Sequence, residues 1–233
     1  MIRIFSNTLH MKRGFLFLCC ITLVLSCQKK SPVAQGQFMI VHATSDLDPL
    51  RFEIDGKSFG SSEVAFPGNT GYQPLPEGKH RLVAFAGGTS QFDLEFITAA
   101  EVKQTLFIYG YRANQLVFAT VDNLNMTGTG TAGVRFFHLW PFGPEVGIDI
   151  INGNTLRPLF VDRPFDFPSA AFANSNFKAV VAGTYTLQVQ FGNGIPKYTL
   201  DGVQFKEGKH YTVFLRRPLA SNAIFELEVI AND

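Results

Sequence analysis

Cysteine is missing from almost the whole chain of 233 residues. The three cysteines, Cys19, Cys20 and Cys27, all lie near the N-terminus. If the chain is cleaved before Cys27, the mature protein has one cysteine at its first position. It can then form no internal disulfide, and its folded part offers no thiolate for a metal or for nucleophilic catalysis. The fold must be stabilised by burial of apolar surface, for which ~200 residues are sufficient.

Charged residues are also few, at 17% of the chain, and neither sign dominates. Removal of the first 26 residues takes away three basic side chains and no acid, which leaves 17 basic against 19 acidic side chains. This balance argues against nucleic acid, or an electrostatic membrane patch, as the main partner. No later apolar run approaches the ~18 residues that a membrane-spanning helix needs.

The chain also lacks phosphate-binding loops and nucleotide motifs. We expect no cofactor, no metal and no enzymatic activity. A hydrolase with paired carboxylates is the least favoured alternative. It stays open because spacing along the chain says nothing about the ~5–10 Å separation that such a pair needs in space.

The N-terminal region is typical of an export signal. Lys12 and Arg13 form its positive segment, and Gly14 to Leu25 is apolar with one polar interruption. This apolar segment is too short for a stable membrane-spanning helix. The residues before Met11 fit the pattern poorly, so the sequence leaves open whether Met1 or Met11 is the true start.

The signal comprises residues 1–26, and its last residues resemble the bacterial lipobox. Val24, Leu25 and the small Ser26 precede Cys27 directly. The resemblance implies cleavage before Cys27, a lipid on its sulfur, and acylation of the new amino terminus. Several acyl chains anchor a protein almost permanently, because each buried CH₂ contributes ~0.8 kcal/mol. The alternative is an ordinary secretory signal that happens to contain a cysteine.

The cargo behind this anchor is a long, aromatic-rich β chain, and the combination is similar to lipoproteins of the Bacteroidetes group. In that group, surface export goes with acidic residues just after the lipidated cysteine. Here Gln28, Lys29, Lys30 and Ser31 follow it. We therefore expect an outer-membrane lipid anchor on the periplasmic side, with residues 27–36 as lipidated cysteine and tether.

Two copies of one module follow, in residues 37–121 and 134–233, with a linker rich in Gly, Thr and Asn over 122–133. Phe38-Met39-Ile40-Val41-His42 is matched by Val134-Arg135-Phe136-Phe137-His138. Both copies therefore begin with an apolar strand that ends in histidine.

Later segments of the copies match as well. Glu101 to Ile108 corresponds to Glu207 to Phe214, and the second copy is longer, with its extra residues expected around 156–176. The hairpin signals Asp55-Gly56 and Asn152-Gly153 occupy equivalent places.

Alternation of apolar and polar residues predicts strands. Leu50, Phe52 and Ile54 share one face in the first copy, as Leu187 and Val189 do in the second. No part of residues 37–233 shows a sustained helical period. We expect an all-β fold of two tandem β-sandwich domains after an N-terminal signal helix.

The order of these strands resembles domain-of-unknown-function family 4397. His42-Ala43-Thr44-Ser45-Asp46 is close to the family's His-Ala-Ser-Pro-Asp pattern, and Lys209-His210-Tyr211-Thr212-Val213 fits its late strand. The second copy departs from the first pattern with His138-Leu139-Trp140-Pro141-Phe142. The resemblance implies immunoglobulin-like β-sandwiches in exported proteins, with no settled activity.

The histidines are the most tempting candidates for chemistry. His42 and His138 end equivalent strands in phase with residues that face inward. We expect buried structural groups that hydrogen-bond the backbone of the following loop, with ligand binding, metal binding or catalysis as alternatives. His80 and His210 follow Gly-Lys at strand starts and are expected to be exposed.

Two acids and four aromatic residues complete the candidates. Asp46 and Asp48 lack the further oxygen ligands and the glycine of a calcium loop, so a turn stabilised by aspartate is favoured. Four aromatic residues lie in proline-containing loops of the second copy and are the candidate ligand contacts: Trp140, Phe142, Phe165 and Phe167. The favoured interpretation is that they cover an open end of the sandwich or the face between domains, with ligand contact as the alternative.

These observations favour a lipid-anchored, non-enzymatic binding or scaffolding module of the cell envelope. Its expected partners are the membrane, through the lipid on Cys27, and an envelope protein or polysaccharide. A glycan-binding lipoprotein that uses the aromatic residues of the second copy is the alternative.

Metabolic labelling with a palmitate analogue should mark the protein, because the lipid is attached at Cys27. Cys27→Ala should abolish the label, whereas Cys20→Ala, which changes a cysteine of the removed segment, should keep it. Equal labelling of the Cys27→Ala protein would contradict lipidation at this residue.

Overall fold

The regular structure of the chain is almost entirely β. The computed structural model describes residues 33–44, 46–47, 49–111, 114–125, 128–141, 143–192, 195–216 and 225–233. Within these ranges, all elements are strands apart from one 3-10 helix, η1 (Ala171–Asn174), and no helix is long and apolar enough to cross a membrane. The expected all-β class is confirmed. The predicted signal helix and Cys27 lie outside the described residues.

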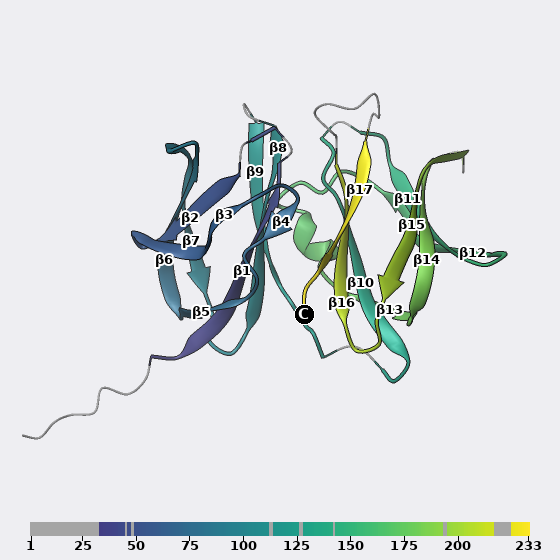
Figure 1. The fold of residues 1–233 in the computed structure, drawn as a ribbon, viewed down its shortest axis with the longest axis horizontal. Coiled ribbons are helices and arrows are strands. Elements are labelled where there is room, and N and C mark those ends of the chain that lie inside the picture. The colour runs from purple at the N-terminus through teal and green to yellow at the C-terminus, as the bar shows by residue number, and fades with distance from the viewer. Residues whose placement is uncertain are drawn as a thin grey trace, which may run out of the picture. The chain divides into compact units, whose positions relative to one another are not determined.

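Strands β1 to β9 form two sheets that pack face to face, here called the first sandwich (Figure 1). Sheet A has the order β4-β1-β8-β9, with β5 also paired to β1, and sheet B has the order β3-β2-β6-β7. The strands are β1 (Gln35–Ala43), β2 (Leu50–Ile54), β3 (Lys57–Val64), β4 (Gly68–Asn69), β5 (Gln73–Pro76), β6 (Gly78–Ala86), β7 (Thr89–Thr98), β8 (Lys103–Tyr111) and β9 (Asn114–Val121).

Strands β10 to β17 repeat this order as the second sandwich. Sheet C has the order β13-β10-β16-β17 and sheet D the order β12-β11-β14-β15. The pair β10·β16 is parallel, as is β1·β8 in the first sandwich. The strands are β10 (Thr131–His138), β11 (Val146–Asn152), β12 (Thr155–Arg163), β13 (Lys178–Val181), β14 (Gly183–Phe191), β15 (Ile195–Phe205), β16 (His210–Arg216) and β17 (Glu226–Ala231).

Each sandwich encloses its own apolar core, and the predicted alternation accounts for it. Leu50, Phe52 and Ile54 of β2 are buried between sheets A and B. Leu187 and Val189 of β14 are buried in the same way between sheets C and D. These strands alternate because only one of their two faces is covered.

Sheets A and C are buried on both faces, because a third core lies between them. In β1, Ile40 belongs to the core of the first sandwich, while Met39 and Val41 belong to the third core. In β10, Phe136 belongs to the core of the second sandwich and Phe137 to the third. Two-sided burial explains why β1 and β10 read as near-continuous apolar runs without alternation.

Aromatic rings fill the centre of this third core. Phe107 of β8 and Phe118 of β9 lie with their ring centroids 5.0 Å apart. Phe137 of β10 contacts both, at 5.1 Å from Phe107 and 5.0 Å from Phe118. One ring from sheet C therefore closes a cluster with two rings from sheet A, which is a favourable geometry for aromatic packing.

The structure corrects the alignment of the copies in their late strands. Met39 lies opposite Thr105 in the parallel pair β1·β8, and Arg135 lies opposite Thr212 in β10·β16. Thr105 thus corresponds to Thr212 and not, as predicted, to Tyr211. The prediction was wrong by one residue because it followed the glutamate and lysine of the preceding turn, whereas the apolar faces of the strands fix the register.

The first hairpins of sheets B and D differ in how well they match the predicted loop positions. Asp55 and Gly56 form the two-residue loop of β2 and β3 with φ of 52° and 73°, as the predicted Asp-Gly hairpin requires. In sheet D, Asn152 pairs with Thr155, so the loop begins at Gly153, one residue later than predicted.

Replacing Phe137 by alanine should destabilise the protein by about 3–5 kcal/mol, because a fully buried ring is lost between two sheets. The matched control is Phe172→Ala, which truncates a phenylalanine that is 68% exposed. Its effect should stay within about 0.5 kcal/mol in denaturant titrations. Equal small losses for both variants would show that sheets A and C are not packed together in solution.

Candidate functional site

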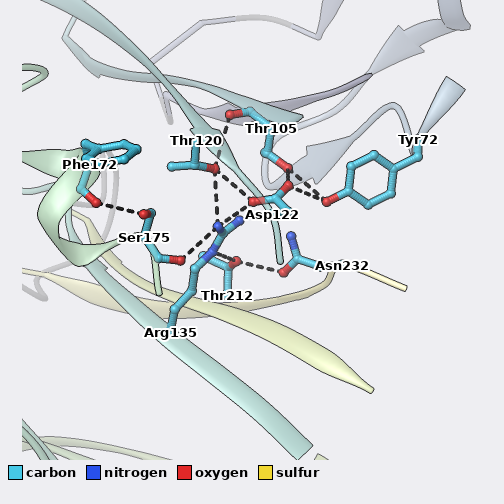
Figure 2. Close-up of polar contacts among 9 residues, drawn as sticks. All are labelled: Tyr72, Thr105, Thr120, Asp122, Arg135, Phe172, Ser175, Thr212 and Asn232. Atoms are coloured by element: carbon cyan, nitrogen blue, oxygen red, sulfur yellow. Dashed lines mark hydrogen bonds and ion pairs between the residues drawn. The ribbon is translucent and has the colours of Figure 1, made fainter. Parts of the chain in front are cut away.

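A buried polar network crosses from the first sandwich to the second (Figure 2). Its centre is Asp122, directly after β9, whose side chain is fully buried. Tyr72 and Thr105 donate hydrogen bonds to its Oδ2, and Thr120 donates to its Oδ1 at 2.9 Å. Arg135 Nη1 of β10 reaches the same Oδ1 at 2.5 Å. These protein donors replace the hydrogen bonds to water that the carboxylate loses on burial.

Arg135 is equally well enclosed. Its Nε donates to Thr212 Oγ1 at 2.8 Å, and Thr212 in turn donates to Asn232 Oδ1 at 2.7 Å. Its guanidinium carbon lies 4.5 Å from the ring centroid of Phe177 and 5.3 Å from that of Phe137. The protein's own groups surround the ion pair, so this network holds the sandwiches together and leaves no room for a substrate.

His138 lies at the end of β10 and is fully buried. Its Nε2 is 2.9 Å from the Pro144 carbonyl oxygen, and its Nδ1 accepts the Trp140 N–H at 3.3 Å. Both contacts are to the backbone of the loop that follows the strand. Burial lowers the pKa of His138 to about 4, so the imidazole is neutral at physiological pH.

Opposite His138, a long loop connects β12 with β13 and contains η1. We call residues 164–177 the aromatic loop; it overlaps the range 156–176 where extra residues were predicted. Asp166 anchors it: the His138 N–H donates to Asp166 Oδ2 at 2.7 Å, and Asp166 N–H donates to the His138 carbonyl at 2.9 Å. Tyr109 of β8 donates to the Asp166 carbonyl at 2.8 Å.

Further contacts fix the aromatic loop internally. Asn174 Nδ2 donates to Asp166 Oδ1 at 2.5 Å, and Ser175 Oγ donates to the Phe172 carbonyl at 2.7 Å. Burial raises the pKa of Asp166, which is only 1% exposed. The helix η1 of this loop lies against β9 and β10, one strand from each sandwich (Figure 1).

The aromatic loop nevertheless presents two phenylalanines to solvent. Phe167 is 56% exposed and Phe172 68% exposed. They are the aromatic members of the large hydrophobic residues that are exposed in the described parts of the chain. The only charged residue between 164 and 177 is the buried Asp166, so the exposed surface of the loop is uncharged.

The predicted ligand contacts are therefore divided. Trp140 is half-buried and stacks on Phe225 at 5.8 Å, while Phe165 is 9% exposed and belongs to the third core. Phe167 packs edge to face on Phe165 at 4.6 Å and is the exposed member of the predicted set. Phe142 lies outside the described residues.

The other predicted positions lie elsewhere. His42 is fully buried, and its Nδ1 accepts the Thr44 N–H at 3.4 Å, the same i+2 contact that His138 makes. Asp46 is buried, and Asp48 lies outside the described residues. In the described part of the chain, no three His, Cys, Asp or Glu side chains form a group able to hold a metal.

The prediction that His80 and His210 are exposed was wrong. His80 is 7% exposed, with Nδ1 2.6 Å from Asp55 Oδ2 and Nε2 2.8 Å from the Pro76 carbonyl. His210 is fully buried, with Nδ1 3.1 Å from Asp233 Oδ2. Both imidazoles are buried against aspartates that lie far away in the sequence, which the Gly-Lys signal does not reveal.

Sequence reasoning also missed Asp122 and Arg135. Asp122 was placed in the linker, and Arg135 was passed over within an apolar strand. The available signal was an arginine that is the only charged residue of its strand before the histidine at the strand end. A charge in such a strand needs a buried partner.

One catalytic pattern of the sequence also went unnoticed. Gly56-Lys57-Ser58-Phe59-Gly60 matches the Gly-x-Ser-x-Gly pattern of serine hydrolases, which requires a strand, a sharp turn and a helix. Here Ser58 is an exposed ladder residue of β3, opposite Glu53 of β2, with no helix after it. Ser58 therefore does not stand where the nucleophile of a serine hydrolase stands.

Two open grooves lie at the sides of the sandwiches. One, of about 400 Å³, lies between β7 and β9, and the other, of about 460 Å³, is lined by β11, β12, β13 and β14. Both are lined largely by apolar strand residues and are the uncovered sides of the two cores.

Comparison with known proteins gives one family and several distant structures. Residues 36–149 match a family described as a domain of unknown function, DUF4397. The matched stretch runs from β1 into β11 and so includes the whole first sandwich. No curated protein matches the chain.

Among solved structures, three similar ones come from Parabacteroides distasonis and Bacteroides fragilis. A candidate cell adhesion protein from Parabacteroides distasonis is 9% identical (TM-score 0.24; 85% of this chain and 99% of that chain covered). A candidate cell adhesion protein from Bacteroides fragilis is 9% identical (TM-score 0.23; 85% and 98%). A fimbrial assembly protein from P. distasonis is 11% identical (TM-score 0.22; 86% and 99%). Likenesses of this size do not define a shared function.

The neutral, buried His138 should make the protein less stable in mild acid. An unfolded histidine titrates at 6.5, so protons favour the unfolded chain as the pH falls from about 6.5 to about 4. Wild type should lose up to about 3 kcal/mol of unfolding free energy in this window relative to His138→Gln, which cannot titrate.

Urea unfolding of both proteins between pH 4 and 8 measures this difference. Because Asp166 is present in both proteins, its own titration cancels in the comparison. Parallel curves for the two proteins would mean that His138 is accessible to protons in the folded state.

Proposed function

We propose that this protein is a lipid-anchored, non-enzymatic binding module of the cell envelope. It consists of two immunoglobulin-like β-sandwiches, both copies of the DUF4397 module, behind a cleaved signal of residues 1–26. Cys27 carries the lipid, and the anchor lies in the periplasmic leaflet of the outer membrane. The repeated strand order of the two halves and the family match over 36–149 support the domain assignment. The lipobox-like Val24-Leu25-Ser26-Cys27 supports the anchor.

The observation that carries this proposal is the aromatic loop. It is fixed by the buried Asp166 and by Tyr109 from the other sandwich, yet it exposes Phe167 and Phe172. A surface that is already ordered loses little entropy on binding. Exposed aromatic side chains on such a surface are typical of the anchors through which proteins bind partners.

The buried acids support binding over carboxylate chemistry. Asp122 is paired with Arg135, Asp149 accepts from Gln190 at 3.0 Å, and Asp166 is held by Asn174. Each of these carboxylates is occupied by protein donors inside the structure. An acid or base for hydrolysis must instead be able to reach a substrate.

Two partner classes fit the aromatic loop. An envelope protein would cover the phenylalanines as hot-spot anchors. A polysaccharide is the second candidate, favoured by the absence of exposed charge between residues 164 and 177, because the apolar faces of sugar rings stack on uncharged aromatic side chains.

Replacing both Phe167 and Phe172 by serine should lower binding at least tenfold, because two truncated anchors remove at least 1.4 kcal/mol of binding energy. The measurement is retention of residues 28–233 on immobilised envelope fractions from the producing cells. Protease treatment of the fraction should abolish retention if the partner is a protein, and periodate treatment if it is a polysaccharide.

The matched control is Ile97→Ser, which removes a side chain that is 72% exposed on β7, away from the aromatic loop. Its melting temperature and binding should equal those of wild type. Unchanged retention of the Phe167→Ser/Phe172→Ser protein would show that the aromatic loop is not the contact surface.

A further inference from the structure

The two sandwiches bring equivalent positions to the surface where they meet. Met39 and Arg135 occupy the same place, opposite Thr105 and Thr212 in the two parallel strand pairs. Asp122 and Asn232 are also equivalent. The Asp122 N–H donates to the Lys103 carbonyl at 2.8 Å and the Asn232 N–H to the His210 carbonyl at 2.8 Å, directly after the last strand of each sandwich.

The equivalent residues make equivalent hydrogen bonds. Thr105 Oγ1 donates to Asp122, and Thr212 Oγ1 donates to Asn232 Oδ1 (Figure 2). The apolar surroundings match as well, since Phe107 and Phe214, two residues further along each strand, both belong to the third core. The two facing surfaces are therefore versions of one surface.

Charge breaks this equivalence. The surface of sheet A has neutral Met39 and anionic Asp122, while the surface of sheet C has cationic Arg135 and neutral Asn232. Both charged side chains are completely buried, and they bond to each other at 2.5 Å. Each surface thus contributes one charge, and the charges are opposite.

We propose that the Arg135–Asp122 pair makes sheet A and sheet C specific for one another. A second copy of the chain can therefore bind here only when sheet A of each chain contacts sheet C of the other. Two A surfaces in contact would bury two carboxylates, and two C surfaces two guanidinium groups. A buried charge without an opposite partner is strongly unfavourable. The apolar residues of both surfaces fit either partner, so they supply affinity and the charges supply selectivity.

The same charges indicate that the partner at this surface is a second copy of the chain. A second copy can offer its C surface to the first chain's A surface and receive the first chain's C surface in return. Such a reciprocal pair contains two Arg135–Asp122 bonds and no unpaired buried charge. Since the two sandwiches of one chain are joined by the short segment between β9 and β10, the same contact normally forms within one chain.

A charge-reversal experiment on residues 28–233 tests this selectivity. Asp122→Arg gives a chain with two positive surfaces, and Arg135→Asp gives one with two negative surfaces. Each alone should melt at a lower temperature than wild type. Refolded together at equal concentration, they should form a 1:1 heterodimer in light scattering and native mass spectrometry. The double variant Asp122→Arg/Arg135→Asp is the matched control and should return to a monomer, because its charges are complementary within one chain.

A neutral variant tests the same selectivity if the charge-reversed chains do not fold. Asp122→Asn/Arg135→Met gives each surface the residues that the other sandwich already has at these places. It should fold, because both replacements are neutral and leave no unpaired buried charge. At high protein concentration it should refold into a mixture with at least tenfold more dimer than wild type. Clean monomers of this variant, or a mixture of reversed chains without heterodimer, would overturn the proposal.

Discussion

The ion pair between Asp122 and Arg135 is the contact on which the arrangement of this protein depends. Both side chains are fully buried between sheets that are themselves covered on both faces. Burying two charges is unfavourable unless the geometry is good and further hydrogen bonds are made. Three hydroxyl groups around Asp122, and Thr212 with the aromatic rings around Arg135, meet that requirement. An apolar contact tolerates sliding, whereas this pair fixes one register between the sandwiches.

The candidate binding surface depends on the same junction. The aromatic loop belongs to the second sandwich, but Tyr109 of the first donates to the Asp166 carbonyl, and Phe165 inserts into the third core. Ser175 of the loop also offers its carbonyl to Arg135 Nη1 at 3.4 Å. The exposed Phe167 and Phe172 are thus held by contacts from both halves. Loss of the junction would release them, so binding and the pairing of the sandwiches are physically linked.

Comparison of the predicted and observed sites shows where reading a sequence reaches its limit. The strand-end histidines His42 and His138 were found because apolar periodicity places them, and both bond the backbone two residues later. Of the three predicted aromatic contacts that the structure describes, only Phe167 is exposed, because exposure depends on which surface a loop packs against. Phe172 was missed for the same reason. His80 and His210 were misjudged because their acceptors, Asp55 and Asp233, are 25 and 23 residues away in the chain.

The sequence by itself determined the all-β class, the alternating strands of sheets B and D, and the Asp55-Gly56 hairpin, since these depend on residues a few positions apart. It also indicated two modules, because an apolar strand ending in histidine occurs twice. The tertiary structure decided that sheets A and C face each other, that Asp122, in the segment between β9 and β10, belongs to a buried network, and that Arg135 is its partner. Such pairings join surfaces from separate sandwiches, and no local pattern records which buried charge will meet which.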